Sequence, residues 1–139
     1  MGLFPDTAPA GLISLKSNFP FQETLDRLIH QVETKGLTVF GRVDHAAAAV
    51  GAGLQLRPTE VLIFGNAKGG TPLMQVTQTI GIDLPLKALI WQDAAGQTWI
   101  SYNDPVWLTE RHGIAAAGAA PATAMRTLLS SVTKAAAMP

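Results

Sequence analysis

The sequence predicts an α+β domain in which helices pack on a mixed β-sheet of about five strands. Short apolar runs suited to strands alternate with segments whose apolar residues recur at helical spacing. These elements follow one another in the order β-α-β-(α)-β-α-β-β-α-α. The chain has 139 residues, of which 47% are hydrophobic and 14% charged, so it can bury one core and is too apolar for general disorder.

The first half of the chain alternates strands and helices behind a short leader. Residues 1–10 contain prolines and small residues and are expected to form a flexible leader, with residues 11–139 folding as a single compact domain. Pro20 stands where a helix would begin and Gly36 where it would end. Asp44 is placed to cap a short helix. The expected elements are a strand over 12–16, a helix over 21–35, a strand over 37–43, a short helix over 46–50 and a central strand over 59–64.

The second half contains a glycine-rich loop, a hairpin and three helices. Thr71 and Pro72 are typical of an N-cap and a first helical residue, and Asp104 and Pro105 repeat that pattern. Small residues at 115–120 predict a linker. The expected elements are a helix from 71 to 80, paired strands over 86–91 and 98–102, a helix that begins at 104–105 and stops at 113, and a last helix from 121.

Composition excludes several classes of protein. Ten basic and ten acidic residues cancel, so neither a nonspecific nucleic-acid binder nor a polybasic membrane binder is expected. The absence of cysteine excludes disulfides, thiolate metal sites and cysteine nucleophiles. Apolar runs are too short or interrupted to span a bilayer, and the N-terminus lacks the features of a signal peptide. We therefore expect a cytoplasmic protein.

The segment 65–72 (GNAKGGTP) is the best candidate site. It follows a buried strand and precedes a helix N-terminus, where free N–H groups and the helix dipole attract anions. We expect Gly69 and Gly70 to present unpaired backbone donors, Lys68 to add a positive charge and Asn66 to add an amide. The residue order matches neither a Walker loop nor G-x-G-x-x-G. The segment predicts binding of a small molecule or anion, although a tight turn alone would also explain the glycines.

Acid–base chemistry is an alternative function. The candidate groups are Asp44, His45, His112, Tyr102 and Lys87, and an enzyme would need at least two of them in one pocket near the glycine-rich loop. The histidines lack the spacing of a metal-binding motif, so no metal and no cofactor is expected. The sequence leaves open whether the protein is an enzyme and whether His45 and His112 have a function.

Assembly is a further alternative. The segment Ala115–Ala137 is rich in alanine, and an apolar stripe runs along it at positions i, i+3, i+4 and i+7. This stripe consists of Met125, Leu128, Leu129 and Val132. It packs either in the core of its own subunit or against a second copy of the chain, in which case the protein is a homodimer.

Several separated motifs resemble the family called domain of unknown function 302. Residues 65–74 (GNAKGGTPLM) resemble the signature G-N-P-K-x-G-T-P-L-M, with Ala67 where the family usually has proline. Residues 83–87 (DLPLK), 101–105 (SYNDP) and 111–113 (RHG) resemble three further segments of the family in the same order. The resemblance runs from about residue 12 to the final helix and covers most of the chain.

The resemblance implies a small α+β domain that is often a dimer, and it implies no activity. It also strengthens the interest in the polar residues of these motifs, because they exceed what a turn requires. The ligand-binding candidates are Asn66, Lys68, Gly69, Gly70, Thr71, Lys87, Tyr102 and Asn103. A homodimer and a small anionic ligand are the expected partners.

Overall fold

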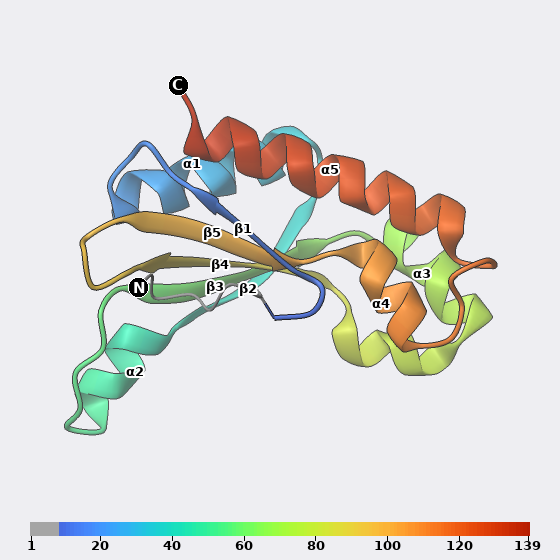
Figure 1. Cartoon of the computed structure of the whole chain (residues 1–139), viewed down its shortest axis with the longest axis horizontal. Helices are drawn as coiled ribbons and strands as arrows, with labels where there is room; N and C mark the ends of the chain where they lie inside the picture. Colours follow the sequence, from blue (N-terminus) through green and yellow to red (C-terminus); the bar gives the residue numbers. More distant parts are fainter. Residues whose placement is uncertain (1–8) are drawn as a thin grey trace.

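Five strands form one antiparallel sheet in the order β1-β5-β4-β3-β2 (Figure 1). The structure is a computed structural model, and it describes residues 9–139. The strands are β1 (Leu12–Lys16), β2 (Thr38–Asp44), β3 (Thr59–Gly65), β4 (Leu86–Gln92) and β5 (Thr98–Asn103). The helices are α1 (Phe21–Thr34), α2 (His45–Gly51), α3 (Ala67–Val76), the 3₁₀ helix η1 (Gln78–Asp83), α4 (Pro105–Arg111) and α5 (Ala119–Ala137).

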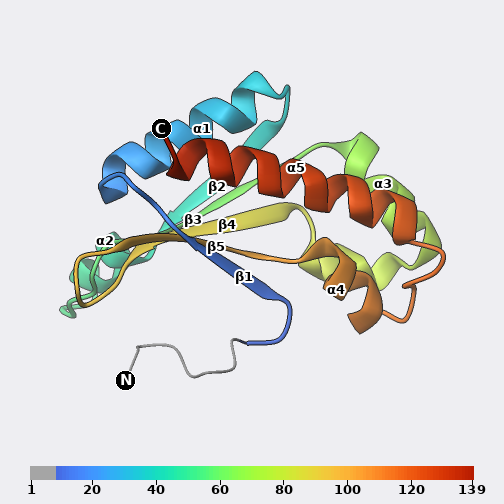
Figure 2. The ribbon, with the colours of Figure 1, turned by 45° about the horizontal axis from the view of Figure 1, so that its top comes forward.

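Helices α1 and α5 lie side by side on one face of the sheet (Figure 2). Strand β3 alternates accordingly, since Leu62 and Phe64 are fully buried while Val61 and Ile63 on the opposite face are half-buried. Helix α1 contributes Leu25, Leu28 and Val32 to the same core, each fully buried. Burial of these side chains, at about 1.5–3 kcal/mol each, fixes the register of the sheet against the helices.

The α+β class, the five strands and the order of elements are confirmed. All pairings are antiparallel, whereas a mixed sheet was expected. Strands β2 to β5 pair in chain order, and β1 joins the far edge beside β5, so each neighbour runs in the opposite direction. The last helix begins at Ala119, inside the segment expected to be a linker. The expected leader over 1–10 lies largely outside the described residues.

The other face of the sheet is largely open, because α1 and α5 lie on the opposite face and the short helix α2, although it contacts β3, projects from the end of the sheet. Helix α2 and the chain that follows it project from the far ends of β2 and β3, on the side away from α1 and α5 (Figure 1). No residue of α2 is buried, and Val50 and Leu54 are 70% and 66% exposed. We call residues 44–57 the arm. The fold therefore has one covered face, one open face and an apolar projection beside the open face.

Candidate functional site

The glycine-rich segment forms the first turn of α3. The side chain of Asn66 caps this helix, because its Oδ1 accepts a hydrogen bond of 2.8 Å from the N–H of Gly69. The N–H of Gly70 bonds to the backbone oxygen of Asn66 at 3.2 Å. The helix thus starts at Ala67 and not at Thr71, and the expectation of unpaired donors at the two glycines is wrong.

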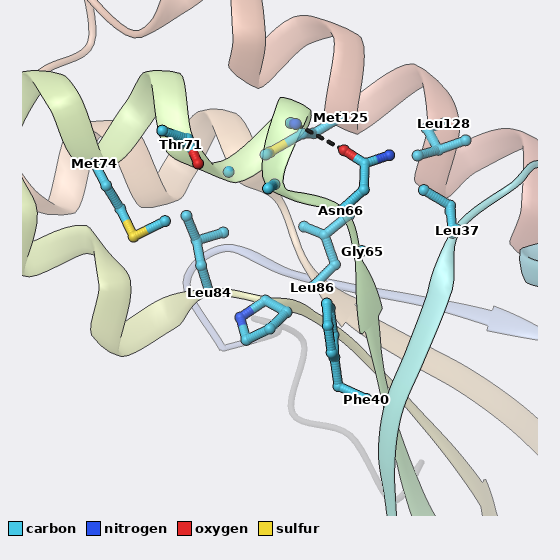
Figure 3. Close-up of a pocket in the computed structure, with 14 residues that line it drawn as sticks. Leu37, Phe40, Gly65, Asn66, Thr71, Met74, Leu84, Leu86, Met125 and Leu128 are labelled. Atoms are coloured by element: carbon cyan, nitrogen blue, oxygen red, sulfur yellow. Dashed lines mark hydrogen bonds between the residues drawn. The ribbon is translucent and has the colours of Figure 1, made fainter.

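A cavity of about 250 Å³ lies against this turn (Figure 3). Its walls come from the N-terminal half of α3, the start of β2, the chain entering β4 and the middle of α5. Among the described residues that line it, Asn66 and Thr71 alone have polar side chains. The apolar walls are formed by Leu37, Phe40, Met74, Leu84, Pro85, Leu86, Met125 and Leu128. Sequence reasoning found the loop but missed these walls, because they come from segments far apart in the chain.

The predicted ligand-binding residues divide between separate places. Four of them, Asn66, Gly69, Gly70 and Thr71, line the cavity. The neighbouring Lys68 is exposed and does not line it. The remaining predicted residues lie on two central strands of the sheet, away from this cavity.

Those remaining residues lie on the neighbouring strands β4 and β5. Lys87 and Asn103 are half-buried and, together with Tyr102, line a shallow hollow of about 320 Å³ on the open face. Tyr102 alternates with Asn103 and is 6% exposed, and burial raises the pKa of its hydroxyl while a hydrogen bond with Thr133 of α5 opposes that shift. Lys87, Tyr102 and Asn103 thus lie together on the paired strands β4 and β5, outside the cavity at the glycine-rich loop.

The candidate acid–base groups do not converge at the glycine-rich loop. Asp44 caps α2, accepting a bond of 2.9 Å from the N–H of Ala47, and the neighbouring His45 is exposed on the arm. None of the five candidate groups, all within the described residues, lines the cavity. The enzyme alternative, which required two of them in this pocket, gains no support from the geometry.

His112 instead belongs to an ion-pair cluster with Asp83 and Arg111. One carboxylate oxygen of Asp83 accepts hydrogen bonds of 2.6 Å from both His112 Nε2 and Arg111 Nη1. Nδ1 of His112 lies 3.3 Å from the hydroxyl of Thr79. Burial raises the pKa of Asp83, but the bonds from His112 and Arg111 outweigh it, so the pKa lies below its usual value. This cluster links η1 to α4. The sequence did not predict the contact, although the segments 83–87 and 111–113, which contain the three residues, were both recognised as motifs.

The apolar stripe of α5 is used inside the subunit. Met125, Leu129 and Val132 are buried in the core, and Leu128 is half-buried at the cavity. A dimer would therefore need another surface. Among residues 9–139, no three histidine or carboxylate side chains gather as a metal site, and no helix is long and apolar enough to cross a bilayer.

Comparison with known proteins identifies the family. The family described as Domain of unknown function DUF302 matches residues 13–135. The chain belongs to this family. A crystal structure of an uncharacterized conserved DUF302 protein from Bacillus stearothermophilus superposes with a TM-score of 0.83 at 19% identity, covering 92% of this chain and 99% of that one. At this identity, the likeness shows a common DUF302 fold.

Two curated relatives are similar to this chain over part of their length. The chain is 45% identical over 125 residues to the fluoride-specific ion channel FluC 1 of Brucella suis, and equally to FluC 2 of Brucella melitensis. These matches cover 90% of this chain but 49% and 46% of the two relatives. The chain thus spans about half the length of the curated relatives it matches.

Proposed function

We propose that this DUF302 domain binds a small, largely apolar molecule in the cavity at residues 65–72. The observation that carries the proposal is the glycine pair in the first turn of α3. Gly69 and Gly70 lie in helical conformation without positive φ, so their backbone does not require glycine. Glycine within a helix costs about 1 kcal/mol relative to alanine, and this helix contains two in succession.

The space around Gly69 and Gly70 explains their presence in the helix, which their backbone conformation does not require. A Cβ at Gly70 would lie 3.6 Å from the Met74 methyl and 3.7 Å from Leu84, and both of these side chains line the cavity. A Cβ at Gly69 would lie 3.3 Å from Oδ1 of Asn66, the atom that caps the helix, and 3.5 Å from the Met125 methyl, another wall residue. The missing side chains therefore leave room in the cavity at the expense of helix stability. This pattern is expected where a ligand approaches the backbone closely.

The chemistry of the walls supports an apolar ligand. Leucine, methionine, proline and phenylalanine side chains surround the space, and the two methionines can adapt their shape to an occupant. A cavity of about 250 Å³ is at the small end of ligand pockets, so a molecule of one or two rings is the expected size. The lining offers little to a small bare ion, because an ion would lose hydration without gaining enough donors.

Methionine methyl groups provide the test. The chain has four methionines, of which Met74 and Met125 line the cavity while Met138 at the C-terminus does not. With ¹³C-methyl methionine, small aromatic probes should shift the signals of Met74 and Met125, leave that of Met138 unchanged, and raise the melting temperature. Fluoride belongs in the same series because the curated relatives are named for it, and we expect no shift from it. Unmoved Met74 and Met125 signals across all the aromatic probes would refute the proposal.

We also propose that two copies of the domain associate through the open face of the sheet. Val61, Ile63 and Leu89 are half-buried there, on the face opposite α1 and α5, although water-facing positions of an antiparallel sheet are usually polar. The arm, which contains the exposed Val50 and Leu54, projects on the side of the sheet away from α1 and α5. One chain thus offers an apolar strip on β3 and β4, next to the polar Lys87 and Asn103, and an apolar arm, which a twofold axis can pair reciprocally.

Arm variants test this association without disturbing the core. Val50→Asp and Leu54→Asp change side chains that are exposed, and no residue of α2 is buried, so the fold should be preserved. We expect the wild type to sediment as a dimer and the double variant as a monomer. The matched control is Ile82→Asp, which alters a residue that is 74% exposed on η1 and should leave the dimer intact. A wild type that remains monomeric at millimolar concentration contradicts the proposal.

A further inference from the structure

Asn66 places a hydrogen-bond donor at the wall of a mainly apolar cavity, whose other polar side chain is that of Thr71. Its Oδ1 accepts from the N–H of Gly69, and only an oxygen can fill that role, so the other end of the amide is the NH₂ group. Within the described part of the chain, Nδ2 has no hydrogen-bond partner. Figure 3 shows Nδ2 directed away from the helix turn, toward the end of the cavity where Leu37 and Leu128 lie.

We propose that the ligand carries one hydrogen-bond acceptor, a carbonyl or carboxylate oxygen, which binds Nδ2 of Asn66. The apolar body of the ligand then fills the slot between Gly70, Leu84 and Met125. This inference rests on the proposed binding function and deepens it, because it names the chemical class of the ligand. Asn66 thereby has two roles, in which Oδ1 caps α3 and Nδ2 selects the ligand.

Desolvation gives the selection its strength. In the empty site, Asn66 is exposed and its NH₂ group can bond to water. A pure hydrocarbon that covers the NH₂ group displaces the water and leaves the group without a hydrogen bond. A ligand with an oxygen at that point replaces the lost hydrogen bond. An unmet donor of this kind costs about tenfold in affinity or more. The site should therefore discriminate between two molecules of equal shape that differ only in this oxygen.

The contribution of charge follows from the position of the amide. Asn66 precedes α3, so an acceptor bound to it lies near the positive end of the helix dipole. The N–H groups of Ala67 and Lys68 belong to the first turn and have no acceptor within the described residues. Both features favour a carboxylate over a neutral carbonyl, and these two kinds of acceptor can be distinguished by experiment.

Three probes of nearly equal shape test the inference by calorimetry. These are 2-isopropenylnaphthalene, 2-acetylnaphthalene and 2-naphthoate, which present a methylene group, a carbonyl and a carboxylate at the same position. The wild type should bind the acetyl compound at least about tenfold more tightly than the isopropenyl compound. Tighter binding of naphthoate than of the acetyl compound would assign the natural acceptor to a carboxylate, and weaker binding would assign it to a carbonyl.

The variant Asn66→Asp separates capping from selection. Aspartate keeps the oxygen that caps α3 but replaces the NH₂ group with a second acceptor, so the melting temperature should stay at or above that of the wild type. The preference for acetyl over isopropenyl should fall to about one, and naphthoate binding should be lost. Asn66→Ser, which also caps but has no amide, is the second variant should the first fold poorly.

The outcomes distinguish this inference from the proposed function. Equal affinity of the wild type for the acetyl and isopropenyl compounds overturns the role of Asn66 and leaves the cavity as a binding site. A preference that survives in both variants overturns it as well. Failure of all three probes to bind, with unmoved Met74 and Met125 methyl signals, overturns the binding function and this inference with it.

Discussion

Replacement of Gly70 by alanine should stabilise the protein while weakening binding in the cavity. Gly70 is helical, and a Cβ added there would meet Met74 and Leu84 at ordinary van der Waals distances of 3.6 and 3.7 Å. The propensity difference between glycine and alanine is about 1 kcal/mol within a helix. For a chain of 139 residues, whose unfolding entropy scales with its length, that difference raises the melting temperature by about 3 °C.

The added methyl group should at the same time occupy part of the cavity. Thermal denaturation followed by circular dichroism measures the stability, and titration of 2-acetylnaphthalene by calorimetry measures the affinity. Gly51→Ala is the matched control, because Gly51 ends the exposed helix α2 and a Cβ there would meet nothing within 4 Å. It should leave the affinity unchanged. A destabilised Gly70→Ala protein, or one that binds as tightly as the wild type, would refute the argument that this glycine is retained for space.

Three other variants test local features of the fold. Gly36→Ala should destabilise the protein by about 1–2 kcal/mol in urea unfolding, because Gly36 has a φ of +75° although its surroundings are empty. Asp83→Asn should lower the free energy of unfolding by about 2 kcal/mol at pH 7, because the hydrogen bonds to His112 and Arg111 are weakened. Since the folded-state pKa of Asp83 is lowered from 3.8, its stabilisation is present above that value and is lost as pH falls through the folded-state pKa, so wild type and variant should converge in acid. Leu73→Ala, at a site 1% exposed, should cost about 2–5 kcal/mol and detach α3 from the core.

Local signals in the sequence were sufficient for most elements of the fold. The proline and glycine around α1 and the capping residue before α4 act within a few residues, so the expected and observed bounds differ little. Asp104 caps α4 as expected, accepting from the N–H of Val106 at 3.0 Å. It also pairs with Arg126 of α5 at 2.6 Å, a contact between distant segments that no local pattern contains. The direction of strand pairing depends on such distant contacts, which is why the mixed sheet was expected in place of an antiparallel one.

The start of α3 shows where local reasoning fails. Thr71-Pro72 is a strong start signal, yet the helix begins at Ala67, and its cap, Asn66, lies five residues before the expected cap Thr71. Pro72 lacks the N–H group that would bond to the backbone carbonyl of Lys68, four residues earlier. Lys68 belongs to the first turn and is exposed, so water can bond to that carbonyl and the proline is tolerated inside the helix. Asn66, three residues before Gly69, is also a favoured N-cap residue, and its side chain is the one that caps the helix.

The glycine pair pointed to the place of the candidate site, but the glycines have a different physical role from the one expected. Glycine was expected to free backbone donors for an anion, but both N–H groups are consumed by the cap, Gly69 by the side chain of Asn66 and Gly70 by its carbonyl. What glycine contributes instead is an absent side chain on the face of α3 that meets Met74, Leu84 and Met125. A sequence shows that a glycine is present, while only the fold shows whether it serves conformation, hydrogen bonding or space. Here conformation and hydrogen bonding are both accounted for, and space toward an apolar cavity is the role that is left.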